Sequence, residues 1–272
     1  MNPPVALTIA GSDSGGGAGI QADLKTFGAL GVFGTSAITA ITAQNTMTVV
    51  ASVPMDPALV RTQVETVISD LPVAAVKTGM LANSSIVRTV AELAEEGKLP
   101  NLVVDPVLLS STGCRLLDDE AIPVYLERIL PYAFVTTPNL REARILAGMS
   151  IDDLEGMIEA ARKISAAGPR TVVVKGGHLE GETSPDVVYS GGDVTILPTS
   201  RIPTSNDHGT GCSLSAAIAA YLARGETVEV ATRKAKEFVT MAIAGAAGWT
   251  LGSGRGPLDH FGWGEAARVA RR

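Results

Sequence analysis

The sequence predicts an α/β protein with a mostly parallel central sheet and helices on both faces. Short apolar runs alternate with amphipathic stretches of helical spacing along all 272 residues. Hydrophobic residues make up 46% of the chain and aromatic residues only 4%, so small aliphatic side chains must do most of the packing. No repeat, low-complexity linker or shift in composition divides the chain. We therefore expect a single domain spanning residues 1–272.

Turn residues and apolar periodicity delimit each element in chain order. The expected strands are Val5–Ala10, Ser36–Thr42, Ala74–Lys77, Leu102–Val104, Phe134–Thr136 and Thr171–Val174. The expected helices are Ile20–Leu30, Ala58–Ser69, Ser84–Glu96, Leu140–Ala147, Asp152–Ala167, Val228–Ala247 and one that follows Gly211. Asp56 and Pro57 provide a start signal for the second helix, and Gly97 ends the third. Val187–Tyr189 and Val194–Leu197, joined through two glycines, are expected to form a small hairpin at an edge of the sheet.

Composition excludes several classes of protein. A net charge of −6 and the lack of a lysine- or arginine-rich run argue against a nucleic-acid surface. No apolar stretch reaches the roughly 18 residues that a membrane span needs. Cys114 and Cys212 do not make a disulfide framework, so we expect a cytoplasmic protein. The three histidines are widely separated and lack the spacing of zinc ligands.

The turn Gly209-Thr210-Gly211-Cys212 is the most informative motif, because it opens an alanine-rich helical segment. Two glycines let the backbone bend closely around a bound group. The unpaired N–H groups of the first helical turn, at the positive end of the helix dipole, then suit a phosphate. Cys212 lies among these donors, where the pKa of a thiol tends to fall. The alternative is a structural glycine turn beside a buried cysteine.

The glycine-rich loop Gly11–Gly19 follows the first strand but fits no nucleotide-binding motif. It breaks the G-x-G-x-x-G pattern, and no acidic residue between Lys25 and Asp56 could hold a ribose. It also lacks the G-x-x-x-x-G-K-[ST] pattern of a P-loop. A close approach of the backbone to a small substrate explains the loop, and a purely structural turn fits equally well.

Polar residues follow several strands, where ligands of parallel sheets bind. Asp105, Asn139 and Glu142 form a set of oxygen ligands suited to Mg²⁺ shared with nucleotide phosphates. The alternatives are a helix cap for Asn139 and a solvated position for Glu142. Lys175 could reach a nucleotide phosphate, or be an exposed lysine at a strand end.

Two further polar residues are candidates for binding a substrate ring. Gln44 follows an apolar strand, and Asp23 lies on the first expected helix. A planar amide that faces a pocket suits a heteroaromatic ring, because it donates and accepts hydrogen bonds. Either residue could also be an ordinary polar residue of the surface.

Seven segments match one known family in the same order. They are Ala6–Phe27, Ala43–Thr46, Val76–Met80, Val103–Val107, Thr137–Ala143, Lys175–His178 and His208–Ala220. In these segments the chain resembles the hydroxymethylpyrimidine/phosphomethylpyrimidine kinases of thiamine biosynthesis, members of the ribokinase-like superfamily. The resemblance covers nearly the whole chain and implies the three-layer ribokinase-like fold.

The resemblance also implies an activity, partners and site residues. The enzyme would move the γ-phosphoryl group of ATP to 4-amino-5-hydroxymethyl-2-methylpyrimidine and then phosphorylate the monophosphate to the diphosphate, with Mg²⁺. The pyrimidine pocket would use Gly11, Asp23, Gln44, Met80, Val107 and Cys212. The phosphates and the metal ion would be held by Asp105, Asn139, Glu142 and Lys175, with Lys236 near the phosphates and Gly209, Thr210, Gly211 and Cys212 as the anion hole. Cys212 could also serve as a weak base, and the family suggests a homodimer.

Two alternatives stay open. One is a kinase of pyridoxal or pyridoxine, since related pyridoxal kinases look similar but tend to lack a glutamine at the position of Gln44. The other is a catalytically silent binding protein with the same fold. Loss of Asp105, Lys175 or the Gly-Thr-Gly turn would favour it, and all three are present.

Overall fold

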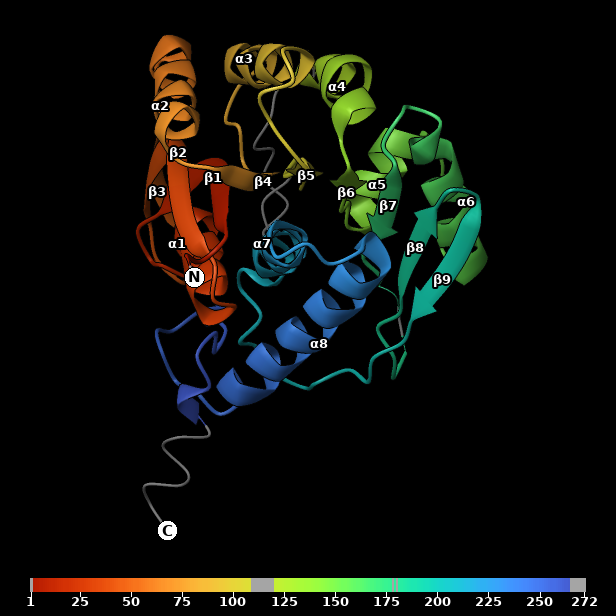
Figure 1. Cartoon of the computed structure of the whole chain (residues 1–272). Coiled ribbons are helices and arrows are strands. Elements are labelled where there is room, and N and C mark those ends of the chain that lie inside the picture. Colours follow the sequence, from red (N-terminus) through yellow and green to blue (C-terminus); the bar gives the residue numbers. More distant parts are fainter. Residues whose placement is uncertain (1, 109–119, 178, 180, 265–272) are drawn as a thin grey trace.

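The computed structural model describes residues 2–108, 120–177, 179 and 181–264. Nine strands form one sheet in the order β3-β2-β1-β4-β5-β6-β7-β8-β9 (Figure 1). The strands are β1 (Val5–Asp13), β2 (Phe33–Gln44), β3 (Val49–Pro54), β4 (Val73–Thr78), β5 (Val103–Val104), β6 (Val135–Thr136), β7 (Thr171–Val174), β8 (Asp186–Ser190) and β9 (Asp193–Leu197). Six neighbouring strands pair in parallel, in the order β2-β1-β4-β5-β6-β7. The pairs β2–β3, β7–β8 and β8–β9 are antiparallel.

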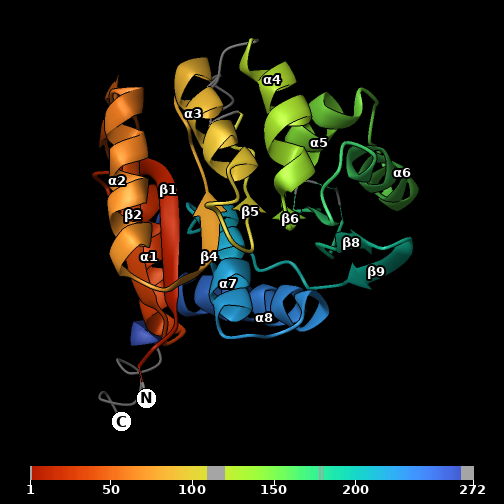
Figure 2. The ribbon, with the colours of Figure 1, turned by 45° about the horizontal axis from the view of Figure 1, so that its top comes forward.

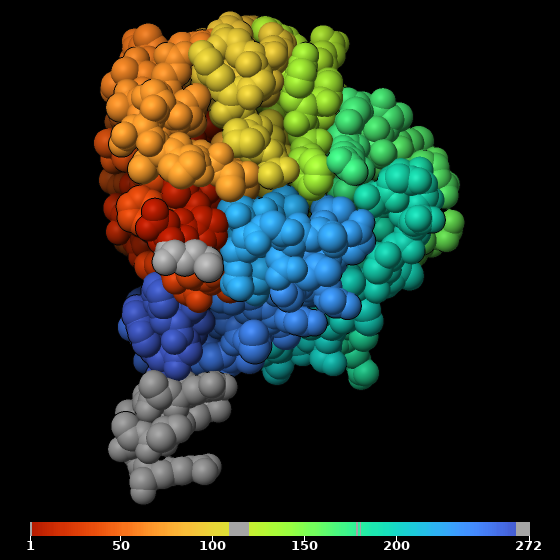
Figure 3. Space-filling view, in the orientation of Figure 1, coloured from red at the N-terminus to blue at the C-terminus, as the bar shows by residue number. Residues whose placement is uncertain are grey.

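Helices cover both faces of the sheet and make three layers. They are α1 (Gly19–Ala29), α2 (Pro57–Asp70), α3 (Ser84–Glu95), α4 (Ala121–Val124), α5 (Leu140–Ala147), α6 (Leu154–Ser165), α7 (Thr210–Ala223) and α8 (Val228–Ala246), with a π turn at Tyr125–Ile129 and a 3₁₀ turn at Leu130–Tyr132. Figure 2 shows α2 to α6 on one face and α1, α7 and α8 on the other. Figure 3 shows the α7 and α8 segment filling the face between the N-terminal elements and the β8–β9 hairpin. Within the described residues, no helix has both the length and the apolar character to cross a membrane.

The alternation of side chains along the strands divides the core into two. Leu7 and Ile9 of β1 pack with the helices α2 to α6, and Ala6 packs with α1, α7 and α8. Successive side chains of a strand point to opposite faces, so a buried strand supplies both cores. Residues Ala216–Ala220 of α7 are fully buried, and their small side chains let this helix lie close to the sheet. The predicted dominance of small aliphatic residues in the packing is confirmed.

The predicted α/β class, the mostly parallel sheet and the edge hairpin β8–β9 are all confirmed, and each expected helix and strand is present. Two regions of regular structure were not predicted. The strand β3 forms the opposite edge, and all six of its residues are exposed, so it has no buried face to set a pattern. The helical turns over residues 121–132 contain Pro123 and Pro131, which weaken a helical pattern in the sequence.

Candidate active site

The site is built where the carboxyl ends of the parallel strands meet the N-terminus of α7. Asp105 directly follows β5, and Lys175 directly follows β7. Lys175 Nζ lies 2.8 Å from Asp105 Oδ1. A Cβ atom on Gly211 would lie 3.1 Å from Lys175 Nζ and 3.9 Å from Asp105 Oδ2. The first turn of α7 therefore rests on this ion pair, and the glycine is what allows it to come so close.

Asp105 is a buried carboxylate whose Oδ1 atom is held by two donors. Besides Lys175, Thr137 Oγ1 donates to Oδ1 at 3.1 Å. Ser215 Oγ lies 3.3 Å from Oδ2, but its single hydrogen has closer acceptors in the carbonyl oxygens of Cys212 and Gly211, at 3.0 and 3.1 Å. Burial would raise the pKa of Asp105, but the charges of Lys175 and Lys77 outweigh it and hold that pKa below the ordinary value. Burial would likewise lower the pKa of Lys175, and Asp105 reverses that shift. Both side chains are charged at neutral pH, which makes a fixed cation beside the helix terminus.

Asn139 and Glu142 form a capping box at the start of α5. The Asn139 side chain accepts from the backbone N–H groups of Arg141 and Glu142, and Glu142 Oε2 accepts from Asn139 N at 2.9 Å. The helix-cap interpretation of Asn139 is thus confirmed. Glu142 is not on a solvated face, because only 2% of it is exposed. Burial, with a contribution from Asp105 and against the effect of Lys175, raises its pKa to about 7.

The two glycine-rich segments predicted from the sequence pack against each other. The Asp13 carboxylate accepts N–H groups from Gly15, Gly17 and Ala18, and so shapes the first loop. A Cβ atom on Gly17 would lie 2.5 Å from the ring of His208, and one on Gly209 would overlap the carbonyl oxygen of Gly17. Gly209 also has a φ of +87°, which favours glycine. The glycines here serve the contact between the first loop and the anion-hole turn.

The helix α7 begins at Thr210 without a side-chain cap. The Thr210 hydroxyl and N–H both bond to the Asp207 carbonyl oxygen, which closes the turn. Among the described residues, no acceptor bonds the backbone N–H groups of Gly211 and Cys212. These two donors, at the positive end of the helix and beside Lys175, form an anion-binding geometry.

Cys212 does not have the chemistry expected from its place at a helix terminus. Burial raises the pKa of its thiol to about 11, and the carboxylates of Asp23 and Asp105 act in the same direction. Lys77 and the Gly19 N–H oppose this shift without cancelling it. The expectation of a lowered pKa is wrong for this structure, because desolvation and two nearby negative charges outweigh the effects of Lys77 and the Gly19 N–H.

Asp23 lies beneath the site rather than at its surface. Its carboxylate is fully buried and accepts from Lys77 Nζ at 2.9 and 2.8 Å and from Thr8 Oγ1 at 2.6 Å. The expected direct contact between Asp23 and a substrate does not agree with this burial. The sequence places Lys77 among the polar residues at strand ends but assigns it no specific role. In the structure, against the effect of burial, the charge of Asp23 raises the pKa of Lys77 above its ordinary value. The place of Lys77 near the end of β4, two residues before Gly79, was the available signal.

The other residues expected around a substrate lie near the same edge. Gly11 N donates to the Met80 carbonyl oxygen at 3.1 Å, and a Cβ atom on Gly11 would overlap the end of the Met80 side chain. Val107 lies two positions after Asp105, and Gln44 ends β2. The Gln44 amide is 3.4 Å from His208 Nε2, so it borders the loop that leads into the anion-hole turn.

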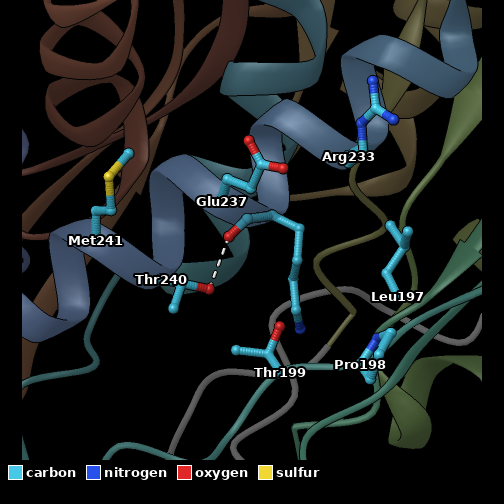
Figure 4. A pocket seen from close by; sticks show the side chains of 8 residues that line it. Leu197, Pro198, Thr199, Arg233, Glu237, Thr240 and Met241 are labelled. Carbon is cyan, nitrogen blue, oxygen red and sulfur yellow. Dashed lines mark hydrogen bonds between the residues drawn. The ribbon is translucent and has the colours of Figure 1, made fainter.

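Lys236 lies on α8, and its contacts link it to the segment of Lys175 through another residue. Its Nζ is 2.8 Å from Asp186 Oδ2 and donates to the Ser184 carbonyl oxygen at 3.0 Å. Asp186 Oδ1 in turn accepts from Gly176 N at 3.0 Å. Asp186, missed in the sequence, therefore links Lys236 to the residue that follows Lys175. Lys236 also lines a cavity of about 570 Å³, with Leu197, Pro198, Thr199, Arg233, Glu237, Thr240 and Met241 (Figure 4).

The raised pKa of Cys212 gives a pH-dependent prediction. With Cys114 replaced by alanine, Cys212 is the only cysteine, and its thiolate absorbance should appear near pH 11 rather than near the ordinary 9.0. The Cys212 thiol then loses its proton at a lower pH in the unfolded chain than in the folded chain. The free energy of unfolding should therefore fall as pH rises from about 9 towards 11. A thiolate signal that titrates below pH 8.5 would contradict this placement of Cys212.

Comparison with known proteins identifies the family to which this chain belongs. The profile of the phosphomethylpyrimidine kinase family matches residues 13–259. A hydroxymethylpyrimidine/phosphomethylpyrimidine kinase of Rhizobium meliloti is 49% identical over 260 residues, covering 94% of this chain and 97% of that protein. A thiamine biosynthesis bifunctional protein of Geobacter sulfurreducens is 46% identical and covers 94% of this chain and 52% of that protein. The structure of an ADP complex of Bacillus subtilis pyridoxal kinase is similar with a TM-score of 0.87 and 40% identity, covering 98% of this chain and 99% of the other. The chain belongs to the phosphomethylpyrimidine kinase family and has the ribokinase-like fold of these vitamin kinases.

Proposed function

We propose that this enzyme transfers the γ-phosphoryl group of ATP to 4-amino-5-hydroxymethyl-2-methylpyrimidine, and then to the monophosphate, in thiamine biosynthesis. The relatives named above support the reaction and its pathway. The observation that carries the proposal is the ion pair of Lys175 and Asp105 against the free N–H groups of α7. That arrangement supplies a positive, preorganised site for a phosphoryl group in transit.

Charge stabilisation is the main chemical task of this site. Phosphoryl transfer passes through a loose transition state, so positioning and neutralisation matter more than early removal of a proton. The N–H groups of Gly211 and Cys212 would bind the oxygens of the transferred group, and Lys175 would add a full positive charge. A Cys212 thiol with a pKa of about 11 is a poor base at neutral pH. We therefore assign Cys212 to the anion hole and the substrate pocket rather than to proton transfer.

The nucleotide would approach from the side of α8. Lys236, which lines the cavity described above, forms an ion pair with Asp186. Asp186 in turn accepts a hydrogen bond from the N–H of Gly176, the residue that follows Lys175. The volume of this cavity and its apolar wall of Leu197, Pro198 and Met241 suit the base of a nucleotide. Asn139 and Thr210 would then act near the phosphates mainly by fixing the starts of α5 and α7, because their side chains already bond to the backbone.

The two carboxylates fit Mg²⁺ bound largely through water. Asp105 Oδ1 already accepts from Lys175 and Thr137, and one oxygen of Glu142 accepts from Asn139 N. No group of three metal-ligating side chains occurs in the part of the chain that the structure describes. A metal ion held by nucleotide phosphates and water, with Asp105 and Glu142 around it, agrees with both facts. When bound, it would neutralise charge on those phosphates.

The test of the function is ADP release with three acceptors. We expect turnover with the aminopyrimidine alcohol and with its monophosphate, weaker turnover with pyridoxal, and loss of all three with a chelator until Mg²⁺ is restored. Efficient turnover with pyridoxal alone would favour the pyridoxal kinase alternative, which the 40% identity to the Bacillus subtilis structure supports. Absence of ADP release with every acceptor would favour a silent binding protein.

Replacement of Gly211 by alanine tests the anion hole. The new Cβ atom would lie 3.1 Å from Lys175 Nζ, so it should displace the lysine and the first turn of α7. Loss of one such set of donors lowers kcat by about a hundredfold in comparable sites. The matched control is Gly28→Ala in α1, where a Cβ atom meets nothing within 4 Å. If Gly211→Ala folds and retains the kcat of the control, the anion-hole assignment is wrong.

We also propose that the enzyme is a homodimer assembled through the β2–β3 edge. Val49, Val50 and Val53 of β3 are exposed, as are Phe33 and Ile41 of β2. A long, apolar edge strand invites pairing with another chain. Light scattering should give twice the chain mass of 28.0 kDa, and Val50→Glu should shift it to one chain. Ile196→Glu on the other edge is the control, and a monomeric wild type would contradict the proposal. The cytoplasmic location expected from the sequence stays a prediction.

A further inference from the structure

The Gln44 side-chain amide lies between two polar groups that constrain it. One end of the amide is 3.3 Å from Thr42 Oγ1, and the other end is 3.4 Å from His208 Nε2. The oxygen and nitrogen of an amide have nearly the same shape, so the neighbouring hydrogens decide which end is which. Both neighbours have their hydrogens fixed by other bonds.

Thr42 can only accept a hydrogen bond from Gln44. Its hydroxyl has one hydrogen, which it donates to the Ser12 carbonyl oxygen at 2.8 Å. A carbonyl oxygen cannot donate in return, so this hydrogen is not available to the amide. The end of Gln44 that faces Thr42 must therefore be the NH₂ group.

The His208 Nε2 atom cannot accept a hydrogen bond from Gln44. Its Nε2 atom lies 3.0 Å from Asp13 Oδ2, which also accepts the N–H groups of Gly17 and Ala18. Burial would raise the pKa of Asp13, but the bonds from His208 and the loop N–H groups hold it below the ordinary value. The carboxylate is thus an acceptor, and Nε2 must carry a hydrogen. The end of Gln44 that faces His208 must be the carbonyl oxygen.

We propose that Thr42 and His208 are positioning residues that fix the orientation of the Gln44 amide and thereby the choice of substrate. This rests on the proposed function, because it concerns how Gln44 meets the pyrimidine. With one N–H donated to Thr42, the amide keeps its second N–H as a donor and its carbonyl oxygen as an acceptor for a ligand. The exocyclic amine of the substrate then lies on the His208 side and donates to Oε1. The adjacent ring nitrogen lies on the Thr42 side and accepts from Nε2.

The experiment compares the dissociation constants of two ligands by calorimetry. One is the 4-aminopyrimidine alcohol, and the other is the same alcohol without the amino group. Thr42→Val removes the acceptor that holds the NH₂ end, so the preference for the amino compound should fall about tenfold. Thr42→Ser keeps the hydroxyl and should retain the preference. The control is Thr35→Val, since Thr35 donates to the Ala6 carbonyl oxygen on the same pair of strands, far from the site.

His208→Leu provides a second, independent variant, and it should also reduce the preference for the amino compound. The inference is overturned if both Thr42→Val and His208→Leu keep the wild-type ratio of dissociation constants, or weaken the two ligands equally. ADP release by the wild type separates this outcome from failure of the function. If the wild type phosphorylates the aminopyrimidine alcohol and the ratios do not change, the positioning role alone is wrong. If it does not phosphorylate that alcohol, the proposed function fails and the inference falls with it.

Discussion

The ion pair between Lys175 and Asp105, held against the first turn of α7, is the interaction on which the site depends. Two buried charges are costly to keep unless they are paired and hydrogen-bonded. Thr137 adds a second donor to Asp105, and a second buried ion pair joins Lys77 and Asp23. The protein thus keeps a positive charge in place before any phosphate arrives, so little reorganisation is needed during the reaction.

The second constraint is the contact between the two glycine-rich segments. Asp13 shapes the first loop, and the loop packs against His208 and Gly209. His208 directly precedes the anion-hole turn, and its ring lies beside Gln44. The contact between His208 and Gln44 therefore links the residues proposed to bind the pyrimidine with those proposed to bind the phosphoryl group. Asp13 and His208, which are 195 positions apart in the sequence, meet here because β1 and β4 are neighbours in the sheet and α7 packs on both (Figure 2).

The fold was largely predictable because its signals are local. Strands such as Thr171–Val174 are short apolar runs between turns, and helix starts such as Asp56 and Asn139 carry their own capping residues. The strand β3 escaped prediction because it buries no side chain. For the site, polar residues at strand ends indicated Asp105 and Lys175, and the glycine motif before an alanine-rich helix indicated the turn at Gly209. Properties that depend on three-dimensional surroundings were not predictable: the raised pKa of Cys212, the burial of Asp23, and the link from Lys236 through Asp186.

The central claim, that Lys175 and Asp105 act as one unit on the transferred phosphoryl group, is tested most directly by a double-mutant cycle on kcat. Lys175→Met and Asp105→Asn should each reduce kcat strongly, and the double variant should lose little more than the worse single variant, because residues that act together are not additive. Equal binding of ATP by the folded variants would place the loss in the chemical step. Losses that simply multiply in the double variant would show that the two side chains act independently and would contradict the account.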